Sequence, residues 1–123
     1  MILVDTSIWV RKLRGRQPWA DQMDDQIRRF NVVGHPMVFG ELLLGNRSEG
    51  LLERYAVIPW LPVASHDGVV AMVRARRLSG MGLGWVDSHL LASSLASGTP
   101  LWTADNAMAE AARRLGISWA ADY

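Results

Sequence analysis

Short, continuous runs of apolar residues occur along the chain between longer stretches in which apolar residues recur at helical spacing. Residues 2–4 and 100–103 form two such runs, typical of strands that are buried on both faces of a parallel sheet. Residues 117–119 are a third candidate strand, and two prolines bracket a short extended segment at 59–62. Because helical stretches separate these runs, the pattern predicts an α/β fold, a three-layer α/β/α sandwich around a mostly parallel sheet.

The helical stretches are predicted from apolar spacing and from the residues that favour helix ends. Met108, Ala111, Ala112 and Leu115 stand at offsets of 0, 3, 4 and 7, which places them on one helical face, and Gly116 follows as a stop. The same signals predict six further helices, over residues 8–13, 18–30, 36–45, 49–56, 65–77 and 87–98.

The composition is that of one globular domain covering residues 1–123, with 50% hydrophobic and 20% charged residues. Because the chain has no cysteine, disulfides, thiolate catalysis and cysteine-based zinc sites are excluded. The net charge of +1 gives no sign of polyanion binding by itself. We expect no membrane association and a cytoplasmic location, since no apolar run approaches the roughly 18–20 residues that span a bilayer and the N-terminus does not resemble a signal peptide.

Four acidic side chains stand out by their positions. Asp5 directly follows the first predicted strand, and Asp105 follows the strand at 100–103 after one intervening residue. Asp87 starts a predicted helix just after a glycine-rich loop, and Glu41 interrupts an apolar run. Ligands of open α/β sheets bind beyond the carboxyl ends of the strands, so at least Asp5 and Asp105 point toward the expected site.

Each of these acids also has a structural interpretation. Asp5, Asp87 and Asp105 stand where an N-cap aspartate belongs, and Glu41 fits the polar edge of an amphipathic helix. If the carboxylates converge, their repulsion raises their pKa values unless a divalent cation neutralises them. Ligands that are all oxygen favour Mg²⁺ or Mn²⁺ over zinc, and such a site suits the hydrolysis of phosphodiesters.

Other functional classes fit the sequence less well. A phosphoaspartate receiver needs a late lysine, but Lys12 is the only lysine, and a haloacid-dehalogenase-type phosphatase would have an aspartate in place of Ser7. The loop at residues 80–84 lacks the glycine spacing of a dinucleotide-binding loop. The isolated histidines are interpreted as structural or exposed, and the basic clusters at 11–16 and 74–77 as solvated helix faces rather than RNA contacts.

Four segments occur in the order seen in PIN-domain ribonucleases, namely residues 1–7, 41–45, 85–87 and 101–105. Over residues 1 to about 119 the sequence resembles this family, and within it the toxin component of VapBC-type toxin–antitoxin systems. The family fold is a parallel-sheet α/β/α sandwich, in agreement with the pattern of strands and helices.

The resemblance implies roles for individual residues of this chain. It implies that Asp5, Glu41, Asp87 and Asp105 are the catalytic acids, and that three of them, Asp5, Asp87 and Asp105, hold Mg²⁺ or Mn²⁺. It also implies that two hydroxyl side chains support these carboxylates, those of Thr6 and Thr103.

One position departs from the family pattern. Many relatives have another acid two residues after the fourth one, where this chain has Ala107. The number of metal ions, one or two, therefore stays open, and Asn106 could serve only as a neutral ligand or as a support for one.

The resemblance further implies metal-dependent endonucleolytic cleavage of RNA, a homodimer, and neutralisation by a cognate antitoxin whose tail enters the active-site groove. Two alternatives stay open. One is a PIN-type nuclease that processes RNA outside any toxin–antitoxin pair. The other is a catalytically silent module that dimerises, although four retained acids argue against it because a binding module has no need for adjacent like charges.

Overall fold

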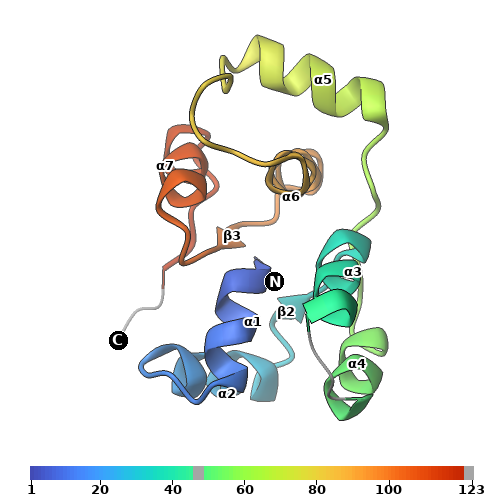
Figure 1. Cartoon of the computed structure of the whole chain (residues 1–123), viewed down its shortest axis with the longest axis vertical. Coiled ribbons are helices and arrows are strands. Elements are labelled where there is room, and N and C mark those ends of the chain that lie inside the picture. The colour runs from blue at the N-terminus through green and yellow to red at the C-terminus, as the bar shows by residue number, and fades with distance from the viewer. Residues whose placement is uncertain (46–48, 121–123) are drawn as a thin grey trace.

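A three-stranded parallel sheet forms the centre of the structure, a computed structural model that describes residues 1–45 and 49–120 (Figure 1). Its strands are β1 (Ile2–Val4), β2 (Val32–Val33) and β3 (Leu101–Trp102), in the order β2-β1-β3. In the register of the sheet, Leu3 lies between Val33 on one side and Leu101 on the other. β1 is buried along its whole length, as its continuous apolar run predicts.

Strand β2 was not predicted from the sequence. It consists of two valines, separated by three residues from a helix that ends at Arg28, and so short a run shows no period of its own. Pairing with β1 makes it a strand, because Ile2 donates its N–H to the carbonyl of Asn31 at 2.8 Å and takes its place opposite Val32.

Two single bridges extend the sheet at its edges. Gly34 pairs in parallel with Trp60, which lies in the extended segment predicted at 59–62. Leu101 pairs in parallel with Ser118, so the strand predicted at 117–119 is reduced to one bridge with two flanking backbone hydrogen bonds. Each bridge therefore adds a short length of chain to one outer side of the sheet.

Seven helices are found in the described part of the chain, and all seven were predicted. They lie in layers on the two sides of the sheet, with α1 and α2 in the lower half of Figure 1 and α6 and α7 in the upper half. The helices are α1 (Thr6–Leu13), α2 (Trp19–Arg28), α3 (Pro36–Gly45), α4 (Glu49–Ala56), α5 (His66–Ala75), α6 (Trp85–Ser97) and α7 (Asn106–Arg114). None of the helices described here is long and apolar enough to span a membrane.

The predicted extent of α2, through Phe30, is wrong. The helix ends at Arg28, and Phe30 has a left-handed backbone with φ of 52° and a side chain that is 87% exposed. Phe30 donates its N–H to Ile27 and Asn31 donates to Gln26, the paired hydrogen bonds of a Schellman motif. The turn that ends the helix therefore directs Phe30 away from the apolar face on which helical spacing placed it.

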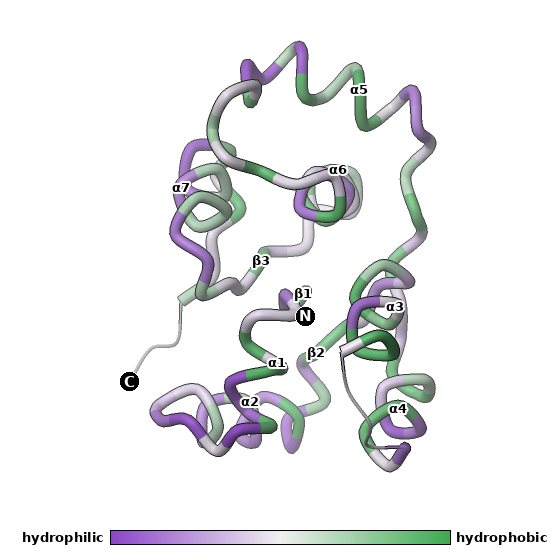
Figure 2. Tube along the Cα trace, in the orientation of Figure 1, coloured by the Kyte–Doolittle hydropathy of each residue, from purple (hydrophilic) through white to green (hydrophobic). Residues whose placement is uncertain are grey.

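The core lies between the sheet and the inner faces of the helices. Figure 2 shows hydrophilic stretches on α2, α4 and α7. The three strands consist of buried apolar residues. Leu90 and Leu91 of α6 are fully buried, as are Met108 and Ala111 of α7. This packing holds the N-termini of α6 and α7 close to the carboxyl ends of β1 and β3.

Candidate active site

Asp5 follows strand β1 and is 6% exposed. It occupies the N-cap position of α1, but its side chain accepts no hydrogen bond from a backbone N–H of the helix, so the capping interpretation of its carboxylate is wrong. Asp5 Oδ2 instead accepts hydrogen bonds from Ser7 Oγ at 2.7 Å and from Thr103 Oγ1 at 2.8 Å. The carboxylate is therefore held between the ends of β1 and β3.

Ser7 is a site residue that sequence reasoning missed. Besides its bond to Asp5, its hydroxyl accepts the backbone N–H of Ala104 at 3.0 Å and lies 3.3 Å from Thr103 Oγ1. The only signal in the sequence is a hydroxyl residue two positions after Asp5, just before the helix predicted at 8–13. Only the pairing of β1 with β3 brings positions 7 and 103 together.

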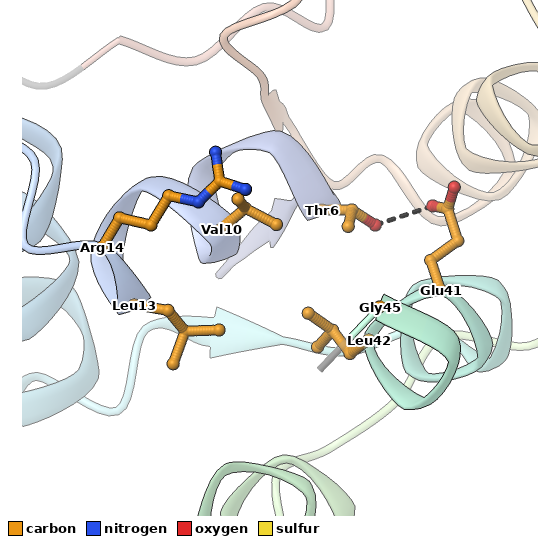
Figure 3. A pocket seen from close by; sticks show the side chains of 7 residues that line it. All are labelled: Thr6, Val10, Leu13, Arg14, Glu41, Leu42 and Gly45. Atoms are coloured by element: carbon orange, nitrogen blue, oxygen red, sulfur yellow. Dashed lines mark hydrogen bonds between the residues drawn. The ribbon is translucent and has the colours of Figure 1, made fainter. Parts of the chain in front are cut away.

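Glu41 lies on α3 and points toward the N-terminus of α1 (Figure 3). Its Oε1 accepts a hydrogen bond from Thr6 Oγ1 at 2.7 Å, although 35 residues separate the two in the sequence. Thr6 therefore supports a carboxylate, as the resemblance implies. The exposure of Glu41 fits the polar edge of a helix, but this bond to a second helix fixes its orientation toward the end of β1.

Asp87 is the third residue of α6, not its N-cap, and its Oδ2 accepts the backbone N–H of Gly84 at 3.0 Å. Burial raises the pKa of the Asp87 carboxyl above its ordinary value, and the negative charges of Asp5 and Asp105 raise it further. The hydrogen bond from Gly84 opposes both effects. Asp5 and Asp105 therefore both lie close enough to Asp87 to act on its charge.

Asp105 is the N-cap of α7, and its Oδ1 accepts the N–H of Met108 at 2.8 Å. The predicted capping role is thus confirmed for Asp105. Its own backbone N–H donates to Thr103 Oγ1 at 3.1 Å. Thr103 therefore contacts both acids that follow the two paired strands, which agrees with the supporting role that the resemblance implies.

The glycine-rich loop leads into α6 and lies beside α7. Gly80 and Gly82 have φ values of +79° and +80°, a left-handed backbone that favours glycine. A Cβ at Gly82 would lie 3.7 Å from the Cβ of Ala107, so this loop packs against the position where many relatives have a fifth acid. Ala107 offers no metal ligand, and Asn106 is the first residue of α7.

The chemistry of these donors fits a hard divalent cation. Within residues 1–45 and 49–120, no group of three acidic or histidine side chains is already close enough together to hold a metal ion. Asp5, Asp87 and Asp105 nevertheless each keep one carboxylate oxygen that makes no hydrogen bond to the described residues. Free carboxylate oxygens are the ligands that Mg²⁺ and Mn²⁺ prefer. Their mutual repulsion opposes a tighter arrangement when no cation is present.

Comparisons with known proteins agree with this fold. The crystal structure of PAE2754 from Pyrobaculum aerophilum superimposes with a TM-score of 0.59 and 18% sequence identity, covering 89% of this chain and 83% of that one. A similarity at this level of identity supports the fold alone. It confirms the α/β/α architecture predicted from the pattern of strands and helices.

The sequence comparisons are more specific. Two curated relatives are each named ribonuclease VapC32, from the CDC 1551/Oshkosh and ATCC 25618/H37Rv strains of Mycobacterium tuberculosis. Each is 40% identical over 124 aligned positions, which cover 98% of this chain and 97% of the relative. The model of the PIN domain family matches residues 2–114, a span that contains all four predicted acids. The chain therefore belongs to the PIN domain family.

Proposed function

We propose that this protein is a metal-dependent endoribonuclease that acts as the toxin of a type II toxin–antitoxin pair. The observation that carries the proposal is the gathering of Asp5, Asp87 and Asp105 at the ends of β1, α6 and β3, where two of the charges raise the pKa of the third carboxyl. Carboxylates brought together in this way favour a cation and a phosphodiester substrate. The similarity to relatives named ribonuclease supports the same activity.

Each side chain of the site has a role in this proposal. Asp5, Asp87 and Asp105 hold Mg²⁺ or Mn²⁺, which when bound offsets the charge of the phosphate and makes water more acidic. Glu41 accepts a hydrogen bond from the attacking water and orients it toward the phosphorus, while Thr6 fixes the direction of the Glu41 carboxylate. Ser7 in the first turn of α1 and Thr103 just after β3 hold Asp5 in place from two different elements.

RNA cleavage by the purified protein tests the enzymatic part. We expect cleavage of total cellular RNA with Mg²⁺ or Mn²⁺, and none when a chelator is in excess. Full activity in excess chelator would contradict the metal requirement.

Inducible expression in cells tests the role as a toxin. Wild type should arrest growth, whereas Asp5→Asn should not, because it removes a charged ligand. RNA cleavage in vitro without growth arrest would instead favour a PIN-type nuclease that processes RNA outside a toxin–antitoxin pair.

We also propose a cognate antitoxin and a second copy of the chain as partners. Support comes from a groove of about 540 Å³ between α2 and α4, lined largely by apolar side chains. Two of these side chains, Phe30 and Val57, are 87% and 82% exposed. Apolar side chains this exposed are typical of surfaces that a partner covers. We assign this groove to the antitoxin, in addition to the active-site groove that the resemblance implies for its tail. A short reading frame adjacent to the gene would identify that partner.

A further inference from the structure

A second feature of the proposed site is a groove of about 440 Å³ that runs between α1 and α3 (Figure 3). One end holds Thr6 and Glu41, which are joined by their hydrogen bond. Arg14 lies at the other end, where α1 has just finished. The groove therefore starts at an acid of the proposed active site and ends at a cation.

The lining of the groove follows from the helical repeat of α1. Thr6, Val10, Leu13 and Arg14 stand at offsets of 0, 4, 7 and 8, which places all of them on one face of the helix. At a rise of 1.5 Å per residue, Thr6 and Arg14 are about 12 Å apart along the axis. Val10 and Leu13 form an apolar floor between them, and Leu42 of α3 faces this floor.

Arg14 differs from the other cations near it. Arg11 donates to the carbonyl of Ser7 and lies over the ring of Trp19, and Lys12 forms an ion pair with Asp24 of α2. Within the ranges that the structure describes, the guanidinium of Arg14 has neither an ion pair nor a hydrogen bond, and the residue is exposed. The basic cluster at 11–16 is therefore not a uniform solvated face, because one of its members lines the groove.

We propose that Arg14 binds a backbone phosphate of single-stranded RNA that lies in this groove, a few nucleotides from the bond that is cut. This inference rests on the proposed ribonuclease function. A guanidinium can donate two parallel hydrogen bonds to one phosphate, and an exposed guanidinium without a partner is available to do so. When no cation is bound, the acidic end of the groove repels phosphates, so the positive charge of Arg14 at the far end determines where the strand lies.

The apolar floor of the groove provides contacts of a different kind for the same RNA strand. Val10, Leu13 and Leu42 cannot bond to phosphate, but they can contact sugars and base faces between the two ends. Contacts to phosphate fix register and carry no sequence information. Arg14 should therefore strengthen the binding of RNA of any sequence equally, and leave the choice of cleavage sequence to other residues.

Binding of a labelled oligouridine over a series of salt concentrations tests the proposal. The measurement uses Asp5→Asn protein, which should bind RNA without cutting it, with and without Arg14→Gln. We expect Arg14→Gln to weaken binding about tenfold at low salt and to reduce the slope of log affinity against log salt by about 0.7, the value for one phosphate contact on a single strand. Arg14→Lys should keep the slope and lose part of the affinity, because it keeps the charge but not the two-pronged geometry.

Arg16→Gln is the matched control. Arg16 is also exposed and only two residues away, but it does not line the groove, so its substitution should leave affinity and slope nearly unchanged. If Arg14→Gln binds RNA as Arg16→Gln does, the proposal is overturned, whether or not Arg14→Gln weakens binding of a protein partner. In that case wild type would still cleave RNA and the proposed function would stand. Wild type that neither binds nor cleaves RNA would overturn both.

Discussion

The hydrogen bonds of Asp5 are not those of a helix cap. Its Oδ2 accepts from Ser7 and Thr103, and no amide of α1 donates to it. The other oxygen is left without a protein donor among the described residues. An asparagine at this position could keep both hydrogen bonds from the hydroxyls through its side-chain oxygen. It would lose the negative charge that Asp5 adds to those of Asp87 and Asp105.

Asp5→Asn should therefore remove the charge of the carboxylate without destabilising the fold. In chelator we expect the variant to melt no lower than wild type, because one repulsive charge is gone. Free Mn²⁺ at 100 times its dissociation constant should stabilise wild type by about 2.7 kcal/mol, and the variant by much less. Thermal melts with chelator and with Mn²⁺ measure this, with Asp67→Asn on the first turn of α5 as the control. A metal response that survives in Asp5→Asn would remove Asp5 from the metal site.

Glu41 allows a comparable substitution with almost no change of shape. Gln keeps an oxygen that can accept from Thr6, so the contact between α1 and α3 should persist. We expect Glu41→Gln to lower the rate of RNA cleavage at least tenfold, because a neutral amide cannot replace an acid that orients water. Glu53→Gln on α4, also an exposed glutamate, should cleave at the wild-type rate. Equal rates for the two variants would return Glu41 to the polar edge of its helix.

Helix α3 owes its start to a buried histidine. The Nδ1 of His35 accepts the N–H of Met37 at 3.0 Å, so the ring proton of the neutral imidazole is on Nε2, which donates to Ser93 Oγ at 2.9 Å. The Ser93 hydroxyl donates in turn to the carbonyl of Pro62 at 2.9 Å. His35 thus caps the helix that carries Glu41 and ties it to α6, the helix that carries Asp87. This role agrees with the structural interpretation of His35.

The His35 cap makes folding sensitive to acid. Burial, with a smaller effect of His89, lowers the pKa of His35 from 6.5 to about 4. Because the unfolded chain binds this proton more readily, the contribution of His35 is complete above pH 6.5 and is lost as the pH falls toward 4. The full loss is roughly 3 kcal/mol at 1.36 kcal/mol per pKa unit.

His35→Asn isolates this effect. The asparagine oxygen can cap Met37 in place of Nδ1 but takes up no proton in this range. The free energy of unfolding of the variant should therefore fall less steeply than that of wild type between pH 6.5 and 4, although the variant is less stable at pH 7 because its bond to Ser93 is gone. Denaturant melts at several pH values measure both slopes. Parallel curves would show that His35 takes up its proton as readily in the folded protein as in the unfolded chain.

At the scale of the whole molecule, Phe30 has an unfavourable backbone conformation and a side chain that is hardly buried. Phe30 combines a φ of 52° with 87% exposure, so its side chain does not repay the backbone strain within this chain. Phe30 also lines the groove between α2 and α4 that we assign to the antitoxin. A partner that covers the ring would account for both features.

Phe30→Gly should thus have opposite effects on folding and on binding. We expect the free protein to gain about 1 kcal/mol of stability, since glycine adopts left-handed φ without strain. The affinity for the protein encoded by the adjacent reading frame should fall, because an aromatic contact is removed. Thermal melts and a titration with that protein measure the two quantities. Unchanged affinity would place the partner on another surface.

The order and type of the larger elements were determined by the sequence. The local pattern of apolar residues, which is visible in the sequence, determines strand β1. It also determines the buried face of α7, formed by Met108, Ala111 and Ala112. β2 and the bridge at Ser118 show no such local repeat, because each is extended only where it pairs with a neighbouring strand. The end of α2 likewise depends on a hydrogen-bonded turn that helical periodicity does not reveal.

The candidate site divides in the same way. Residue type and position along the chain singled out Asp5, Glu41, Asp87 and Asp105 as candidates, and motif resemblance assigned roles to them. The position of two of these acids after strands has a local cause. Only tertiary structure decided that Asp105 caps a helix and that the Asp5 carboxylate does not. The difference depends on the Thr103 hydroxyl, which bonds to Asp5 because β1 and β3 are paired. The hydrogen bond of Glu41 and the place of Arg14 in a groove were decided there too, because both depend on the packing of α1 against α3. Residues separated by tens of positions leave no periodic pattern in a sequence.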